Sequence, residues 1–417
     1  MNRALAVILL ALAPAACSDS SDIPEIRSDL ARDLTPDVSS AELAELVAGN
    51  AEFAAAVYRL AGEGGGNLFL SPHSISTALA MTYAGAANAT ATQMAAALRF
   101  TLPEPKLHAA FNALDLALAE RAKAASGDTI PFRLTTASSI WGQDGWQFEA
   151  PFLDALAVHY GAGLRVRDFA RDPEGAREDI NAWVEDRTND RIQDLIQPGV
   201  ITDATRLVLT NAIYFSAAWA EPFDAAHTAD RPFFLGGGDA QVTVPSLYQR
   251  TEYPYAEGTG YRAAELPYDG GQLSMVVIEP DDLAAFEASL TGARLQEIAA
   301  SLSRYELELT LPKFKFDAPL ELRPILQQLG MADAFTEAAD FSRIDGTRRL
   351  LITDVVHKGF VAIDERGTEA AAATGVIVGP KSVPPSATLV VDRPFVFFIR
   401  DRPTGAILFV GRVVDPR

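Results

Sequence analysis

The chain contains a single cysteine, Cys17, among its 417 residues, so no disulfide can form within it and the fold must hold by packing alone. Histidines are also few, and the five (73, 108, 159, 227 and 357) do not fall at metal-ligand spacings. The sequence lacks a Gly-x-Ser-x-Gly elbow, a His-Glu-x-x-His motif, a glycine-rich phosphate loop and a Cys-x-x-Cys pair. These absences leave nothing that supports an enzyme, a metal or a cofactor.

Positive charge is scarce: 35 Lys and Arg stand against 55 Asp and Glu, a formal net charge of −20 at pH 7. This balance argues against nucleic acid or an anionic membrane surface as a partner. Linkers are lacking too, since no proline- or serine-rich stretch and no internal repeat follows the first 45 or so residues. With 48% hydrophobic residues, the sequence predicts one large domain with a sizeable core.

The one marked apolar run lies at the amino terminus, where Arg3 precedes residues 4–16. This run is typical of an export signal and is too short to span a bilayer as a helix. It ends in small residues before Cys17, as the signals of bacterial lipoproteins do, although Pro14 replaces their usual aliphatic residue. We expect a lipid on Cys17. The alternatives are simple cleavage with secretion, or an ordinary buried thiol.

The expected layout is therefore a signal over residues 1–17, a polar flexible tether over 18–40 and one domain over 41–417. Such a protein would be exported and lipid-anchored in the bacterial cell envelope, or otherwise secreted or periplasmic. Membrane contact would be made only through the lipid.

Residues 365–385 form an unusual segment between two apolar strand patterns. As a strand from Thr368, one face would carry Thr368, Ala370, Ala372, Thr374, Val376 and Val378, with no charge and nothing larger than valine. Yet alanine is depleted in strands, and the Gly-Pro-Lys-Ser tip is typical of an exposed loop. By composition alone such a stretch is most often a linker or a helix end. The flanking sequence instead favours a loop that can become a buried strand.

The flanking sequences resemble those of the serpin family. The resemblance rests on motifs in family order at residues 67–81, 207–223, 309–316, 326–335, 350–373, 392–401 and 405–416. It covers roughly residues 41–417 and implies an α+β fold with three β-sheets, eight to nine helices and an exposed reactive-centre loop at about 365–385.

Hydrophobic patterning predicts helices at 41–60, 74–85 and 180–192, with Trp183 inward, and further helices near 283–290 and 319–329. It predicts strands at 134–141, 207–215, 273–278, 305–311, 355–363, 395–399 and 407–413.

The resemblance implies inhibition by being cut. The serine of a target protease attacks a carbonyl of the loop and forms an acyl-enzyme. The loop then inserts into the central sheet as a new strand and traps the protease. Counting Glu365 as the first loop residue, the family's seventeenth position is Lys381, and a Ser-x-Pro-Pro pattern begins at Ser382. We therefore expect cleavage at Lys381–Ser382 by a trypsin-like protease, whose primary pocket holds a carboxylate.

Three alternatives to this bond and mechanism stay open. Lys381 could be an ordinary solubilising charge. A cut at Ile377–Val378 or Val378–Gly379 would direct inhibition to elastase-like or chymotrypsin-like proteases. A non-inhibitory serpin-fold binding or structural protein would be cut as a substrate without trapping anything.

The hinge of the loop favours an inhibitor. Gly367 supplies a turn after Glu365, Thr368 is small enough to bury, and the charge of Glu369 falls on the outward face. The next four residues pass without steric cost, and they are Ala370, Ala371, Ala372 and Ala373.

Four further residues correspond to the polar cluster by which serpins control opening of the central sheet, namely Ser71, Ser74, Asn211 and His357. Ordinary buried polar groups that satisfy each other are the alternative, and we expect Trp219 to be a packing residue. Residues 101–125 mix Lys106, Arg121 and Lys123 with acidic residues, which argues against activation by polyanions. The expected partner is the target protease alone, bound by an otherwise monomeric protein.

Overall fold

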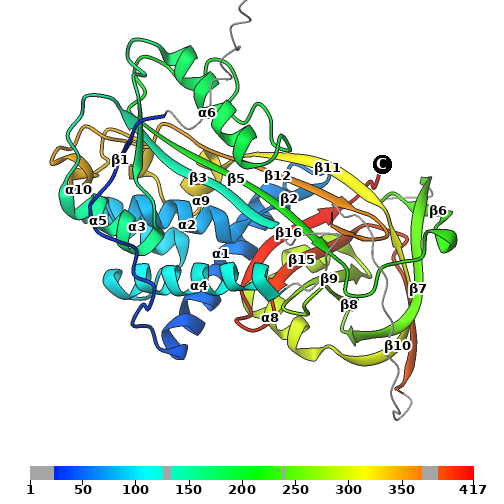
Figure 1. Cartoon of the computed structure of the whole chain (residues 1–417). Coiled ribbons are helices and arrows are strands. Elements are labelled where there is room, and N and C mark those ends of the chain that lie inside the picture. Colours follow the sequence, from blue (N-terminus) through cyan, green and yellow to red (C-terminus); the bar gives the residue numbers. More distant parts are fainter. Residues whose placement is uncertain (1–22, 125–132, 237–239, 369–383) are drawn as a thin grey trace, which may run out of the picture.

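The computed structural model describes residues 23–124, 133–236, 240–368 and 384–417. The predicted signal and Cys17 lie outside these ranges. Within them the α+β architecture is confirmed, with two hydrogen-bonded sheets, most of the helices towards one side, and β6, β7 and β10 at the other end of the molecule (Figure 1).

The central sheet has seven strands. Their order is β1 (Glu25–Ile26), β4 (Leu164–Arg167), β3 (Arg133–Gln143), β5 (Leu207–Ala218), β13 (Gly367–Thr368), β12 (Val355–Ile363) and β11 (Phe314–Glu321). Strand β5 pairs antiparallel with β3 and parallel with β12, so the sheet is mixed.

The second sheet has nine strands. Its main order is β14 (Ser386–Val390), β10 (Ser303–Pro312), β7 (Gln241–Gly258), β8 (Tyr261–Pro267), β9 (Leu273–Pro280), β15 (Phe395–Asp401), β16 (Ile407–Val413) and β2 (Leu68–Leu70), while β6 (Ala229–Phe234) pairs with β7. Within the described residues, two of the three expected sheets are continuous with each other. The physical reason is the length of β7, whose 18 residues pair first with β6 and later with β8, joining two sheets into one.

Ten α-helices lie within the described residues, against the eight or nine expected. They are α1 (Ser40–Gly62), α2 (Pro72–Tyr83), α3 (Asn88–Leu98), α4 (Glu104–Ala124), α5 (Ala150–Tyr160), α6 (Pro173–Arg187), α7 (Leu283–Ala288), α8 (Gly292–Ser301), α9 (Leu322–Gln328) and α10 (Ser342–Asp345). The difference lies in very short helices, since α10 has 4 residues and α7 has 6. In this part of the chain, none of the helices has both the length and the hydropathy needed to cross a membrane.

Local sequence explains where most helices begin. Ser39 and Glu42 form a capping box at the start of α1, and Ser71 caps α2 just before Pro72. The helix expected over 180–192 is misplaced, because Asp172 caps α6 and thereby starts it at Pro173. Similarly, the helix expected over 319–329 begins at Leu322, because the chain continues as β11 up to residue 321.

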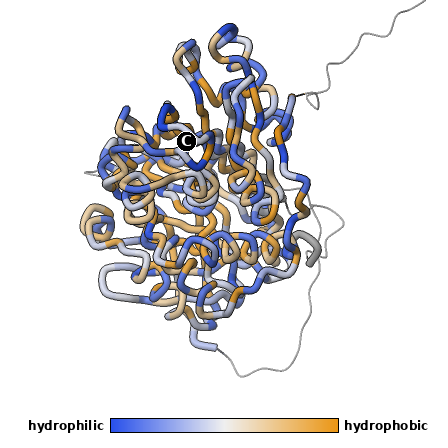
Figure 2. Tube along the Cα trace, turned by 90° about the vertical axis from the view of Figure 1, so that its left-hand side faces the viewer, coloured by the Kyte–Doolittle hydropathy of each residue, from blue (hydrophilic) through white to orange (hydrophobic). Residues whose placement is uncertain are grey.

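Two groups of buried apolar side chains form the core. The larger fills the space between the two sheets and around α1 and α2, and the smaller lies between the central sheet and α6. In the smaller group Trp183 of α6 packs edge-on against Trp141 of β3, with ring centroids 5.4 Å apart, so it faces inward as predicted. Figure 2 shows the hydrophobic segments gathered in the interior of the molecule and the hydrophilic ones around it.

Residues 23–39 do not form the flexible tether that the sequence predicted. Strand β1 adds to the edge of the central sheet beside β4. The Arg32 guanidinium donates to Asn112 at 2.8 Å and to Asp115 at 2.6 Å, and the Asp33 amide donates to the Val158 carbonyl at 2.9 Å. These bonds fix the segment to α4 and α5.

Candidate functional site

The four predicted cluster residues meet beneath the central sheet, and all four are buried. His357 Nδ1 lies 2.7 Å from Asn211 Oδ1, and its Nε2 accepts a hydrogen bond from the Ser71 amide at 3.2 Å. Asn211 Nδ2 donates to Ser74 Oγ at 2.7 Å and to Ser138 Oγ at 2.9 Å. Sequence reasoning missed Ser138, which lies opposite Asn211 in the β3–β5 register, 73 residues away in the chain. The cluster joins the start of α2 to β3, β5 and β12.

The geometry requires a neutral His357. Because Nε2 accepts from the Ser71 amide, the proton must sit on Nδ1, which donates to Asn211. Burial lowers the pKa of His357 from 6.5 to about 3, although a hydrogen bond with the Asn211 backbone acts in the opposite direction. Protonation would place a hydrogen on Nε2 against the Ser71 amide and break the link between α2 and β12.

Strands β5 and β12 pair directly along only part of their length. The direct pairs join Leu209–Ile213 to Val355–Gly359. Beyond them β13 lies between the two strands, with Gly367 opposite Ala218 and Thr368 paired on both sides. The first residues of the predicted loop therefore already occupy a strand position in the central sheet. We call residues 364–368 and their contacts the hinge site.

The turn that leads from β12 into β13 is held by its carbonyl groups. The Trp219 indole nitrogen donates to the Asp364 carbonyl at 3.1 Å, and the Trp219 amide donates to the Arg366 carbonyl at 2.8 Å. Between them the Glu365 carbonyl accepts from the Phe223 amide at 2.7 Å. Trp219 is thus the buried packing residue that the sequence predicted, and it is also a hydrogen-bond donor to the hinge.

The Glu365 carboxylate is fixed by two further residues. Lys313 Nζ lies 3.0 and 2.9 Å from its two oxygens, and Thr228 Oγ1 donates to it at 2.9 Å. Partial burial is the largest influence on the pKa of Glu365 and raises it, but the hydrogen bonds from Lys313, the backbone and Thr228 together bring the pKa below its usual value. The carboxylate is therefore ionised at neutral pH. It links the hinge to Lys313, the residue before β11, and to Thr228, the residue before β6.

Gly367 and Thr368 fit the strand position for separate reasons. A Cβ atom on Gly367 would lie 2.1 Å from the Ala217 carbonyl oxygen, so only glycine fits there. Thr368 is 1% exposed, and its hydroxyl lies 2.7 Å from the hydroxyl of Tyr268, whose ring stacks on Trp219 with centroids 4.6 Å apart. Sequence reasoning missed Tyr268, Lys313 and Thr228, because no local pattern marks them.

The remaining predicted site residues lie outside the described part of the chain. They are Cys17, Glu369, Ala370, Ala371, Ala372, Ala373, Lys381 and Ser382. Their roles stay predictions.

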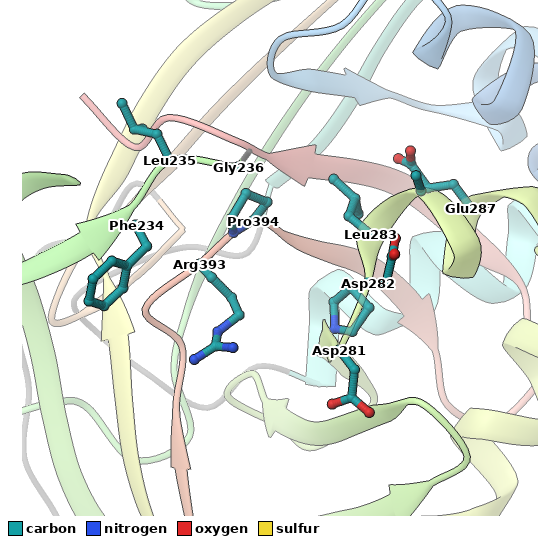
Figure 3. A pocket seen from close by; sticks show the side chains of 11 residues that line it. Phe234, Leu235, Gly236, Asp281, Asp282, Leu283, Glu287, Arg393 and Pro394 are labelled. Atoms are coloured by element: carbon teal, nitrogen blue, oxygen red, sulfur yellow. The ribbon is translucent and has the colours of Figure 1, made fainter. Parts of the chain in front are cut away.

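A pocket of about 670 Å³ opens elsewhere, between the end of β6, the start of α7 and the segment before β15 (Figure 3). Phe234, Leu235, Leu283 and Pro394 give it apolar walls, and Arg393 contributes a guanidinium whose Nε lies 3.1 Å from Glu279 and 3.0 Å from Asp392. The pocket shares no residue with the hinge site or the polar cluster.

The family described as serpin (serine protease inhibitor) matches residues 48–416 of the chain. The leukocyte elastase inhibitor of Bos taurus is 40% identical over 362 residues, which cover 84% of this chain and 93% of that protein. An uncharacterized serpin-like protein of Thermococcus kodakarensis is 38% identical over 356 residues, covering 84% of this chain and 81% of its own.

Among solved structures, the thermophilic serpin tengpin in its native state superposes with a TM-score of 0.80 at 27% identity. The match covers 94% of this chain and 97% of tengpin. The family match over most of the chain, the identity to these relatives and the shared fold agree with the sheet and hinge geometry described above. The chain belongs to the serpin family.

Proposed function

We propose that this protein is an irreversible suicide-substrate inhibitor of trypsin-like serine proteases, cut between Lys381 and Ser382. The protease serine attacks the Lys381 carbonyl, the peptide bond to Ser382 breaks, and the serine proton passes to the departing amine of Ser382. The ester that remains joins the protease to the loop. Insertion of the loop between β5 and β12 then carries the protease away before water can cleave the ester.

The placement of β13 is the observation that carries this proposal. The loop already enters the central sheet at Gly367 and Thr368, which lie between β5 and β12. Insertion would separate the pairs that now join residues 209–213 to 355–359, directly above the polar cluster. A new central strand would form about a dozen backbone hydrogen bonds, each worth roughly 0.5–1.5 kcal/mol net, so insertion is strongly downhill.

A second specificity is favoured by a different observation. The Bos taurus relative is named as an inhibitor of leukocyte elastase, and the loop offers Ile377–Val378 and Val378–Gly379 as bonds for an elastase-like protease. Lys381 supports the trypsin-like class, because a primary pocket with a carboxylate selects a basic side chain.

Mixing the protein without residues 1–17 with trypsin, and separately with elastase, tests both candidates. We expect a complex with trypsin that survives boiling in detergent, and a released fragment whose mass begins at Ser382. The variant Lys381→Ala should lose the trypsin complex and keep its fold. A complex with elastase alone would favour the neighbouring bonds. Cleavage without any complex would identify a non-inhibitory member of the family.

Two charged residues support the expectation that polyanions do not activate the protein. Lys106 lies 3.2 Å from Asp37, and Arg121 lies 2.8 Å from Asp401. Two of the three cations of α4 are therefore already paired within the chain, and the net charge of −20 adds repulsion. We accordingly propose that the protein is a monomeric inhibitor whose partner is the target protease.

For location, we propose export and a lipid on Cys17, with release into the periplasm or medium as the alternative. The signal-like sequence supports this. Labelling with radioactive palmitate should mark the wild-type protein and not Cys17→Ser, and equal labelling of both would exclude the anchor.

A further inference from the structure

We propose that Tyr268 is a positioning residue for loop insertion: its hydroxyl captures Thr368 in the central sheet before any protease arrives. This inference rests on the proposed inhibitory function and adds a residue to it. In the uncut protein the first residues of the loop are then already inserted, and the hydrogen bond to Tyr268 sets the fraction of molecules in which Thr368 lies in the sheet.

The position of the Tyr268 hydroxyl is fixed on two sides. Its ring stacks on Trp219 at 4.6 Å between centroids and meets Phe215 edge-on at 5.1 Å, and the side chain is 1% exposed. Burial raises the pKa of Tyr268 far above its usual value, so the phenol is neutral. Among the described residues, Thr368 is the one side chain to which this hydroxyl is hydrogen-bonded, at 2.7 Å.

The hydroxyl of Thr368 needs a hydrogen-bond partner if it is to stay buried in the sheet. Thr368 is 1% exposed, and a buried hydroxyl without a partner favours a conformation that returns it to water. Removing the Tyr268 hydroxyl would therefore shift the balance between the inserted and released hinge by roughly ten- to a hundredfold. The turn at residues 364–366 would stay in place, because its carbonyls are held by Trp219 and Phe223.

A captured hinge matters because the acyl-enzyme has two fates. Either the loop inserts and the protease is trapped, or water releases an active protease and a spent inhibitor. With Thr368 already between β5 and β12, insertion starts without first parting the strands at that end. A released hinge would delay insertion, so more inhibitor molecules would be consumed per trapped protease molecule.

The experiment is a double-mutant cycle on the protein lacking residues 1–17. The variants are Tyr268→Phe, Thr368→Val and the double variant, with Thr368→Ser as the control that keeps a hydroxyl. The first readout is the number of inhibitor molecules consumed per trypsin molecule trapped. We expect each single variant to raise this number several-fold, the double variant to be no worse than the worse single one, and Thr368→Ser to resemble the wild type.

The second readout does not depend on inhibition. Hydrogen exchange of the peptide covering residues 363–368 in the uncut protein should accelerate at least tenfold in Tyr268→Phe and little further in the double variant. Should wild-type protein form no protease complex, the inhibitory proposal fails while exchange still tests the capture. Unchanged exchange in Tyr268→Phe, or single effects that multiply in the double variant, would overturn the role of Tyr268.

Discussion

Gly367 lies against the backbone of β5 and leaves no room for a Cβ atom. In Gly367→Ala the new methyl group would overlap the Ala217 carbonyl oxygen, 2.1 Å from the Cβ position, so β13 must leave the sheet. We expect at least a several-fold rise in inhibitor consumed per protease trapped, measured by titration against trypsin. The matched control is Gly64→Ala, where no atom lies within 4 Å. Equal behaviour of the two variants would show that the hinge strand is unimportant.

His357 gives the polar cluster a dependence on pH. Its pKa is about 3 in the folded protein against 6.5 in the unfolded chain, so between these values only the unfolded chain binds the proton. The free energy of unfolding should therefore fall as the pH drops below 6.5, by about 1.4 kcal/mol per pH unit from this residue. We expect denaturant titrations at pH 7.5, 6 and 5 to show that the free energy of unfolding falls less with decreasing pH in His357→Gln than in the wild type.

The comparison with His357→Gln isolates one group, because His73 and His108 also have pKa values lowered by burial and remain in both proteins. Parallel pH profiles for the two proteins would mean that His357 is not buried as a neutral base.

At the scale of elements, the pair of Glu365 and Lys313 ties the turn between β12 and β13 to the residue before β11. In Glu365→Gln the hydrogen bonds can persist but the charge attraction is lost. Because the Lys313 side chain is 33% exposed, solvent screens the pair, and we expect a loss of about 1 kcal/mol in unfolding free energy, or about 1 °C in Tm for a domain of this size. The exposed cation in Arg171→Ala should change Tm by less than half as much. A larger effect from Arg171 would contradict this assignment.

Elements that coincide with a continuous apolar run could be predicted from the sequence. Elements whose bounds depend on a capping residue or on pairing with distant strands could not. The bounds of β12 and β16 agree with the sequence, since both are short apolar runs that are buried along most of their length. The bounds of α6 do not, because its start depends on a cap at Asp172 rather than on the apolar pattern. Strand β7 escaped prediction because its 18 residues alternate weakly and gain order from pairing with β6, β8 and β10.

The candidate site divides in the same way. Its hinge and cluster residues could be named from motifs that stand together in the sequence. Tyr268, Lys313 and Ser138 could not, because each meets its partner across a separation of 50 residues or more, and no local spacing reports such a contact.

At the scale of the whole molecule, insertion should change heat stability. The uncut protein has β5 and β12 paired directly over residues 209–213 and 355–359, with Gly367 and Thr368 of the loop between the two strands further on. If the cut loop completes a strand there, the added hydrogen bonds and apolar contacts should raise Tm by many degrees. Calorimetry before and after limited cleavage in the loop measures this. A Tm that stays constant or falls after cleavage would contradict insertion.

The strands that follow the loop determine whether the two fragments separate once the loop has been cut. Strands β15 and β16 lie deep in the second sheet, between β9 and β2, and nearly all their residues are buried. A cut anywhere in residues 369–383 therefore yields two polypeptides that cannot come apart without unfolding. A molecule that is cut without trapping its protease would have the same size in native solution as an uncut one, and the two would be told apart only after denaturation. The ratio of intact to two-piece chains in a sample would then record what fraction of the population has been cut.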